Sequence, residues 1–141
     1  MRSSLTLLVM VLLVVSCSES SGWSRDQAAQ KYLDSVVKNT TSKSLRINQY
    51  PSLLDTGVRI REAYIQRGNV SEYLFCEHPS WLFFLDLAPN AHFAHTVVIS
   101  LLDTVTGEIK SINAQWWPVI ELPAFNTESK RNESSTIVFE K

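Results

Sequence analysis

Residues His95 to Pro118, HTVVISLLDTVTGEIKSINAQWWP, predict two strands joined by a tight turn. The first strand, residues 95–102, is almost continuously apolar and rich in β-branched side chains, which suit a pleated, half-buried surface. Asp103 can open the turn because its carboxylate bonds the backbone two residues on, and Gly107 can close it because glycine tolerates positive φ. The second strand, residues 108–117, alternates apolar and polar side chains. An isolated hairpin is marginal in water, so the rest of the chain must cover its apolar face.

The hairpin ends in Trp116, Trp117 and Pro118. Adjacent residues of a strand face opposite ways, so only one tryptophan can enter the core. Pro118 cannot donate to a ladder and is expected to end the strand. An exposed tryptophan is a favoured anchor of a protein interface. Trp116, Trp117 and Pro118 are therefore the candidate partner-binding residues, and the alternative is that residues 119–125 cover the second tryptophan.

Residues 1–22 have the pattern of a secretory signal peptide, with a short positive start, an apolar stretch over residues 5–15 and small residues after it. The apolar stretch is too short to span a bilayer, and we expect no membrane span elsewhere. Val14 to Cys17 also resembles a bacterial lipobox, which would anchor the chain through a lipid on Cys17. The secreted, extracellular glycoprotein is favoured by three Asn-x-Ser/Thr sequons, whose acceptors are Asn39, Asn69 and Asn132.

Length and composition indicate one globular domain. The chain has 141 residues, of which 45% are hydrophobic and 19% charged. A net charge of -1 and the lack of a basic run argue against a nucleic-acid partner. Without the signal peptide, Cys76 is the one cysteine left, so the chain is no disulfide scaffold. Its apolar neighbours predict a buried thiol, and the alternative is pairing between chains.

The order of elements predicts an α+β fold with one N-terminal helix packed on an antiparallel sheet. A helix is expected from Ser24 to Lys38, because Ser24 and Gln27 form a capping box before an apolar stripe. The strands expected before the central hairpin are residues 45–50, 58–66, 70–78 and 81–85. This domain is expected over residues 23–122. Residues 123–141 are expected to be a polar tail, disordered apart from residues 137–139.

Catalytic and metal sites find little support in the sequence. A catalytic set would need a thiol nucleophile, a base and an acid that orients the base. The residue types for these roles are Cys76, His92 or His95, and Asp86 or Asp103. Cys76, however, lies in a strand pattern and not at a helix start, where the dipole would lower its pKa. The spacing of His92 and His95, even with His78 added, is no zinc pattern. We therefore predict no enzyme, no metal and no cofactor.

A family resemblance is carried by the hairpin and the helix. The residues concerned are Thr96-Val97, Thr106, Glu108-Ile109, Trp116 and Pro118, with Ala28-Ala29, Tyr32 and Ser44-Leu45-Arg46. In these positions the chain resembles the second cystatin-like subdomain of latexin and of its relative, the tazarotene-induced protein, over about half of the mature length. The resemblance implies a cystatin-like roll. In latexin two such subdomains together inhibit metallocarboxypeptidases, and this chain has room for one.

The chain departs from inhibitory cystatins in two ways. It has neither their Gln-x-Val-x-Gly loop nor their paired C-terminal disulfides, which puts the usual wedge mechanism in doubt. The turn at Asp103 to Glu108 also resembles hairpins of the bacterial PepSY module, which would go with a lipid anchor. The function expected is a secreted, non-enzymatic binding protein with a protein partner, and the resemblance implies a protease inhibitor of cystatin or latexin type. The alternatives are a structural or matrix protein and a PepSY-like lipoprotein.

Overall fold

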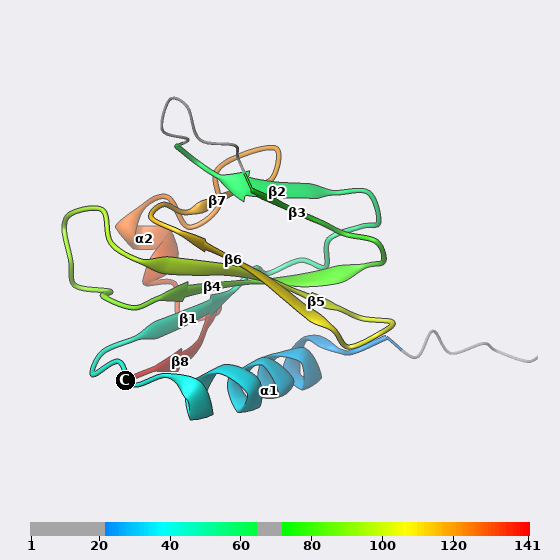
Figure 1. Ribbon diagram of the computed structural model, residues 1–141, viewed down its shortest axis with the longest axis horizontal. Helices are drawn as coiled ribbons and strands as arrows, with labels where there is room; N and C mark the ends of the chain where they lie inside the picture. The colour runs from blue at the N-terminus through cyan, green and yellow to red at the C-terminus, as the bar shows by residue number, and fades with distance from the viewer. Residues whose placement is uncertain (1–21, 65–71) are drawn as a thin grey trace, which may run out of the picture.

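In the computed structural model, which describes residues 22–64 and 72–141, a helix and two antiparallel sheets form three layers (Figure 1). The central layer is a five-stranded sheet in the order β6-β5-β4-β1-β8. Its strands are β1 (Arg46–Gln49), β4 (Ser80–Asp86), β5 (Val97–Asp103), β6 (Ile109–Ala114) and β8 (Ile137–Glu140). Helix α1 (Arg25–Val36) covers one face of this sheet. The α+β class is as predicted, but the helix is not at the N-terminus of the chain, since it begins only at Arg25.

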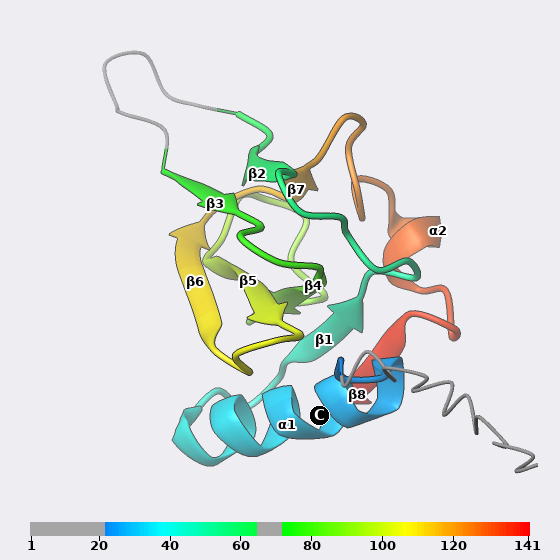
Figure 2. The ribbon, with the colours of Figure 1, turned by 90° about the vertical axis from the view of Figure 1, so that its right-hand side faces the viewer.

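A second, three-stranded sheet covers the other face (Figure 2). It has the order β3-β2-β7 and consists of β2 (Arg59–Glu62), β3 (Tyr73–Phe75) and β7 (Pro118–Val119). The prediction of a single antiparallel sheet was therefore wrong. The reason lies in β4, whose residues are all buried, so that both faces of its sheet need a cover. Strand β2 has one apolar face, on which Ile60 is fully buried, and it lies face-on to β4 instead of beside it.

Helix α1 begins with the predicted capping box. The Ser24 hydroxyl accepts from the Gln27 amide at 3.3 Å, and the Gln27 side chain accepts from the Ser24 amide at 3.0 Å. The helix ends before the predicted Lys38 and passes into a 3-10 turn, η1 (Val37–Asn39). Asn39 and Thr40 cause this end, because their side chains donate to the carbonyls of the last helical turn at 2.8 and 2.9 Å.

The layer between α1 and the central sheet is organised by Tyr32. Its ring stacks on Phe83 of β4, with centroids 4.2 Å apart and planes within 5°. Its hydroxyl bonds the Ser100 hydroxyl at 2.9 Å, and Ser100 in turn bonds Ser111 at 2.8 Å. Burial raises the pKa of Tyr32 to about 12, although the Ser100 hydrogen bond acts the other way. The buried phenol is therefore neutral and has its hydrogen bond satisfied.

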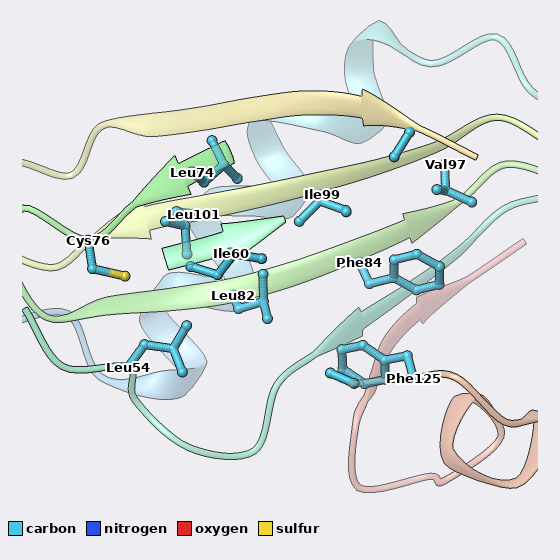
Figure 3. Close-up of a cluster of buried hydrophobic side chains, with 12 residues drawn as sticks. Leu54, Ile60, Leu74, Cys76, Leu82, Phe84, Val97, Ile99, Leu101 and Phe125 are labelled. Carbon is cyan, nitrogen blue, oxygen red and sulfur yellow. The ribbon is translucent and has the colours of Figure 1, made fainter. Parts of the chain in front are cut away.

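The layer between the two sheets contains the second buried cluster (Figure 3). Ile60 of β2 lies there over Leu82 and Leu101 of the central sheet, and Phe84 stacks on Phe125 with centroids 5.7 Å apart. Phe125 comes from the segment that the sequence indicated as a tail. The fold therefore draws on residues far beyond the central hairpin to cover β4.

Two expectations about the C-terminal part of the chain were wrong. Pro118 does not take the chain out of the ladder: it begins β7, where it lies opposite Glu62, because an edge strand tolerates proline as its first residue. Residues 123–141 are not a disordered tail. They contain α2 (Glu128–Arg131) and β8, which pairs with β1, and just before β8 the Thr136 carbonyl accepts from Gln49 N–H at 2.8 Å. A polar segment is ordered here because β1 offers it an unpaired edge.

Candidate functional site

Strands β4 and β5 have two ends that differ in structure. Because they are antiparallel, Ser80 lies opposite Asp103 at one end and Asp86 lies opposite Val97 at the other. The first end, where the turn of residues 103–107 joins β5 to β6, is called the turn end. The second end, where the chain leaves β4 and β6, is called the pocket end (Figure 1, left).

The turn end is closed by hydrogen bonds to Asp103. Its carboxylate accepts from the amides of Val105 and Thr106 at 2.8 and 2.9 Å, and from His78 Nδ1 at 2.7 Å. Burial would raise the pKa of Asp103, but these hydrogen bonds and the His78 charge outweigh it and lower the pKa. Gly107 has φ 70°, as the sequence predicted. The hollow beside this turn measures only about 10 Å³.

The pocket end has a pocket of about 260 Å³ between the sheets. Its floor is formed by Phe84 and Asp86 of β4 and Val97 of β5. One wall is the loop of residues 89–95, and the other is the crossover of residues 115–117 that takes the chain from the large sheet to the small one. Arg131, the last residue of α2, completes the lining.

The crossover presents both predicted tryptophans at this pocket. Trp116 and Trp117 are half-buried and meet edge to face, with centroids 5.5 Å apart and planes at 84°. Tyr64, which is 59% exposed, lies edge-on to both, at 5.1 and 5.8 Å. Trp117 also packs against the cluster between the sheets. The Glu62 carboxylate holds the crossover by accepting from the amides of Gln115 and Trp116.

Trp116 is thus the residue with an outer position and Trp117 the one that reaches the core. The proposed cover, residues 119–125, is not a continuous lid, because Leu122 in its middle is 78% exposed. Pro118 is fully buried within the small sheet. It can hold the crossover in place, but it presents no surface to a partner.

A largely buried histidine–aspartate pair lies in the lining of the pocket. His95 Nε2 and Asp86 Oδ1 are 2.6 Å apart, and their side chains are 18% and 6% exposed. His95 Nδ1 lies 2.8 Å from the Phe93 carbonyl, and the Ala88 amide donates to Asp86 Oδ1 at 2.9 Å. These contacts hold the imidazole against the Asp86 carboxylate in the lining of the pocket.

Arg131 supplies a positive charge to the lining of the pocket. One of its guanidinium nitrogens donates to the Phe125 carbonyl at 2.8 Å, and no carboxylate of residues 22–64 and 72–141 pairs with it. Within the described residues, Arg131 is thus the side chain of this lining that is always cationic and has no carboxylate partner. No sequence pattern indicated this role, since Arg131 belongs to the segment expected to be disordered. Phe93 and Tyr64 were missed as well, because a single aromatic residue in the sequence does not show whether it is buried or exposed.

A larger hollow of about 400 Å³ lies beside residues 120–125, but its polar groups are less available to a ligand. Its lysine, Lys130, is already bonded to the Asn126 side chain at 2.9 Å and to the Pro123 carbonyl at 3.4 Å. Its other charged residues, Glu121 and Glu133, are both acidic. The pocket end is therefore the better candidate, although its volume is smaller.

The thiol and the histidines do not form a catalytic set. Cys76 is fully buried, and burial raises its pKa, with a partial offset from the Ser80 hydrogen bond and a further rise from the Asp103 charge. A protonated, buried thiol is a poor nucleophile. His78 and His95 each pair with an aspartate, at opposite ends of β4 and β5. Over residues 22–64 and 72–141, no three His, Cys, Asp or Glu side chains converge as metal ligands do.

Two of the three predicted glycosylation sites are on the surface of the described structure. Asn39 is exposed at the end of η1, and Asn132 is exposed after α2, where its side-chain oxygen accepts from Arg46. Asn69 lies outside the described residues, as do the predicted signal sequence up to residue 21 and Cys17. In the part of the chain that is described, no helix has the length and apolar character needed to cross a bilayer.

Comparison with known proteins identifies no relative of the chain: no family model, no curated protein and no solved structure matches it.

Proposed function

We propose that the chain is a secreted, non-enzymatic binding protein that holds a protein partner at its pocket end. The observation that carries the proposal is the cluster of Trp116, Trp117 and Tyr64 at a pocket. Interface hot spots are enriched in tryptophan and tyrosine that lie beside a desolvated pocket. Trp117 packs on the core and can hold the cluster rigid, so that little side-chain entropy is lost when Trp116 meets a partner.

A protease inhibitor of cystatin or latexin type is the specific form of this proposal. Its support is topological: α1 is followed in space by β1, β4, β5 and β6 as an antiparallel meander, with the helix packed on one face. A cystatin-like roll has this arrangement, to which β2, β3, β7 and β8 would be additions. Since the turn of residues 103–107 lacks the inhibitory loop pattern and is closed by its own hydrogen bonds, inhibition would act through the pocket end.

The inhibitor proposal is tested with the secreted protein against a panel of cysteine proteases and metallocarboxypeptidases. We expect inhibition at micromolar concentration or below, and a loss of about 2 kcal/mol or more of binding free energy in Trp116→Ala, as for an interface hot spot. Leu122→Ala is the matched control, because Leu122 is highly exposed but lies outside the cluster. A panel without any inhibition contradicts the inhibitor, and equal inhibition by wild type and Trp116→Ala contradicts the pocket end as its site. The rival, a matrix protein with this domain, predicts no inhibition.

Secretion and glycosylation are part of the same proposal. Protein expressed in a eukaryotic host should be cleaved between Ser16 and Gly22 and carry glycans on Asn39, Asn69 or Asn132. Mass spectrometry with and without glycosidase measures both. Diacylglycerol on Cys17 in a bacterial host, without any glycan mass in the eukaryotic one, would favour the PepSY-like lipoprotein instead.

A further inference from the structure

The pocket at the pocket end combines aromatic walls with one cationic group. Phe84 lies at its floor, Phe93 stands on one wall, and Trp116 and Trp117 form the other. Phe93 is 76% exposed, which is unusual for so large an apolar side chain unless it meets a ligand or partner. A planar apolar group between these rings could stack on them or meet them edge to face.

The polar groups of this pocket select the charge of its ligand. The Asp86 carboxylate is already hydrogen-bonded to the His95 ring and accepts from the Ala88 amide, so it is occupied by groups of the protein itself. An arginine has five N–H donors, and within the described residues the Arg131 guanidinium uses one nitrogen, for the Phe125 carbonyl. His92 also lines the pocket and adds no carboxylate to it. The remaining donors of Arg131 match a carboxylate, which guanidinium groups bind through two hydrogen bonds.

The volume sets the size of the ligand. At about 260 Å³ the pocket is just below the range of roughly 300–1,000 Å³ that holds drug-sized molecules. It suits a group of about one amino acid residue. We infer that this pocket binds an aromatic group that carries a carboxylate, with the ring between Phe93 and Trp116 and the carboxylate on Arg131. This ligand class goes beyond the proposed protein partner and is tested without one.

Calorimetry at neutral pH with 3-phenylpropionate and its neutral analogue 3-phenyl-1-propanol tests the inference. The acid should bind at least about tenfold more tightly than the alcohol, because it adds charge-assisted hydrogen bonds. Arg131→Met should remove this difference and leave the binding of the alcohol in place. Arg59→Met is the matched control, because Arg59 lies over Tyr73 on the small sheet and does not line the pocket.

Phe93→Ser keeps the test decisive if Arg131→Met fails to fold. Phe93 is mostly exposed, so this variant should melt like the wild type and bind both compounds at least about fivefold more weakly. Equal affinity of the acid and the alcohol for the wild type overturns the inference. So does the lack of any saturable binding of the acid at millimolar concentration, or unchanged binding in Phe93→Ser.

The source of the carboxylate is distinguished by a peptide. Ala-Ala-Phe with a free C-terminus and its C-terminal amide are measured in the same way. If the peptide acid binds more tightly than 3-phenylpropionate, the ligand is the C-terminal residue of a polypeptide; if it binds more weakly, the ligand is a small free acid. Binding of the peptide amide as tight as that of the peptide acid contradicts the role of Arg131. The protease panel is independent of these measurements, so the two proposals can fail separately.

Discussion

The two ends of the β4–β5 pair each carry a histidine–aspartate pair but put it to different use. At the turn end Asp103 also binds two backbone amides, and the space beside it is about 10 Å³. At the pocket end Asp86 binds His95 in the lining of a pocket of about 260 Å³. The same two residue types thus close a turn in one place and line a cavity in the other. The difference comes from the connections, since a tight turn ends β5 whereas a loop, a crossover and Arg131 surround the end of β4.

Truncation of the two tryptophans should give the largest contrast. Trp117→Ala should cost about 3 kcal/mol of unfolding free energy, at the low end for a buried tryptophan, because Trp117 packs on the cluster between the sheets while remaining half-exposed. Trp116→Ala should cost less than about 1 kcal/mol. Urea denaturation of both variants measures this. A loss of about 3 kcal/mol in both would mean that the crossover is a structural lid and would refute the docking surface.

The turn end should be more sensitive to a glycine substitution than an open turn elsewhere. Gly107→Ala should lose about 2 kcal/mol, because φ is 70° and the new Cβ would lie 3.4 Å from the Trp23 ring and would displace Lys31 Nζ, 2.9 Å away, from its place over that ring. Gly57→Ala is the control, since φ is 91° there but no atom lies within 4 Å of the new Cβ. Its loss should be about 1 kcal/mol. Equal thermal shifts in the two variants would show that packing around Gly107 adds nothing.

Acid should weaken the turn end through Asp103. Its pKa is lower in the folded protein than the value of about 3.9 for an unfolded aspartate, so its contribution is complete above that value and is lost as the pH falls through the folded pKa. Asp103→Asn should therefore cost about 1 kcal/mol at pH 7, and the cost should shrink below about pH 4. Denaturant titrations of wild type and variant from pH 7 to pH 2 measure it.

Glu77→Gln serves as the control for the acid experiment. The pKa of Glu77 is lowered by its hydrogen bond and charge interaction with Lys110, but the group is exposed, and we expect a smaller change in stability. A cost of Asp103→Asn that stays constant down to pH 2 would contradict the role of the carboxylate charge at the turn.

Local features of the fold could be predicted from the sequence because their causes lie within a few residues. The capping box at Ser24, the buried run that became β4, and the turn from Asp103 to Gly107 are of this kind. The partner of each strand could not be predicted. Period-2 alternation shows that β2 has one apolar face, but not that this face covers β4 or that Arg61 pairs with Val119.

The candidate site was only half predictable for the same reason. Trp116 and Trp117 stand out because two adjacent tryptophans cannot share one face of a strand. Arg131 and Phe93 do not, since only the three-layer arrangement brings them to the same pocket. The polar composition of residues 126–135 indicated disorder, because composition alone does not reveal that α2 forms there or that Arg131 donates to the Phe125 carbonyl.

The most direct test of the pocket end as the binding end uses the four tryptophans of the chain, two at each end. Trp81 belongs to the turn end, where its indole donates to the Trp23 carbonyl at 2.9 Å, and Trp23 lies close to Gly107. Trp116 and Trp117 line the pocket. Indole N–H signals are followed by ¹H–¹⁵N NMR during titration with 3-phenylpropionate. The signals of Trp116 and Trp117 should shift saturably while those of Trp23 and Trp81 stay in place; shifts at Trp23 and Trp81 alone, or at none of the four, would contradict the account.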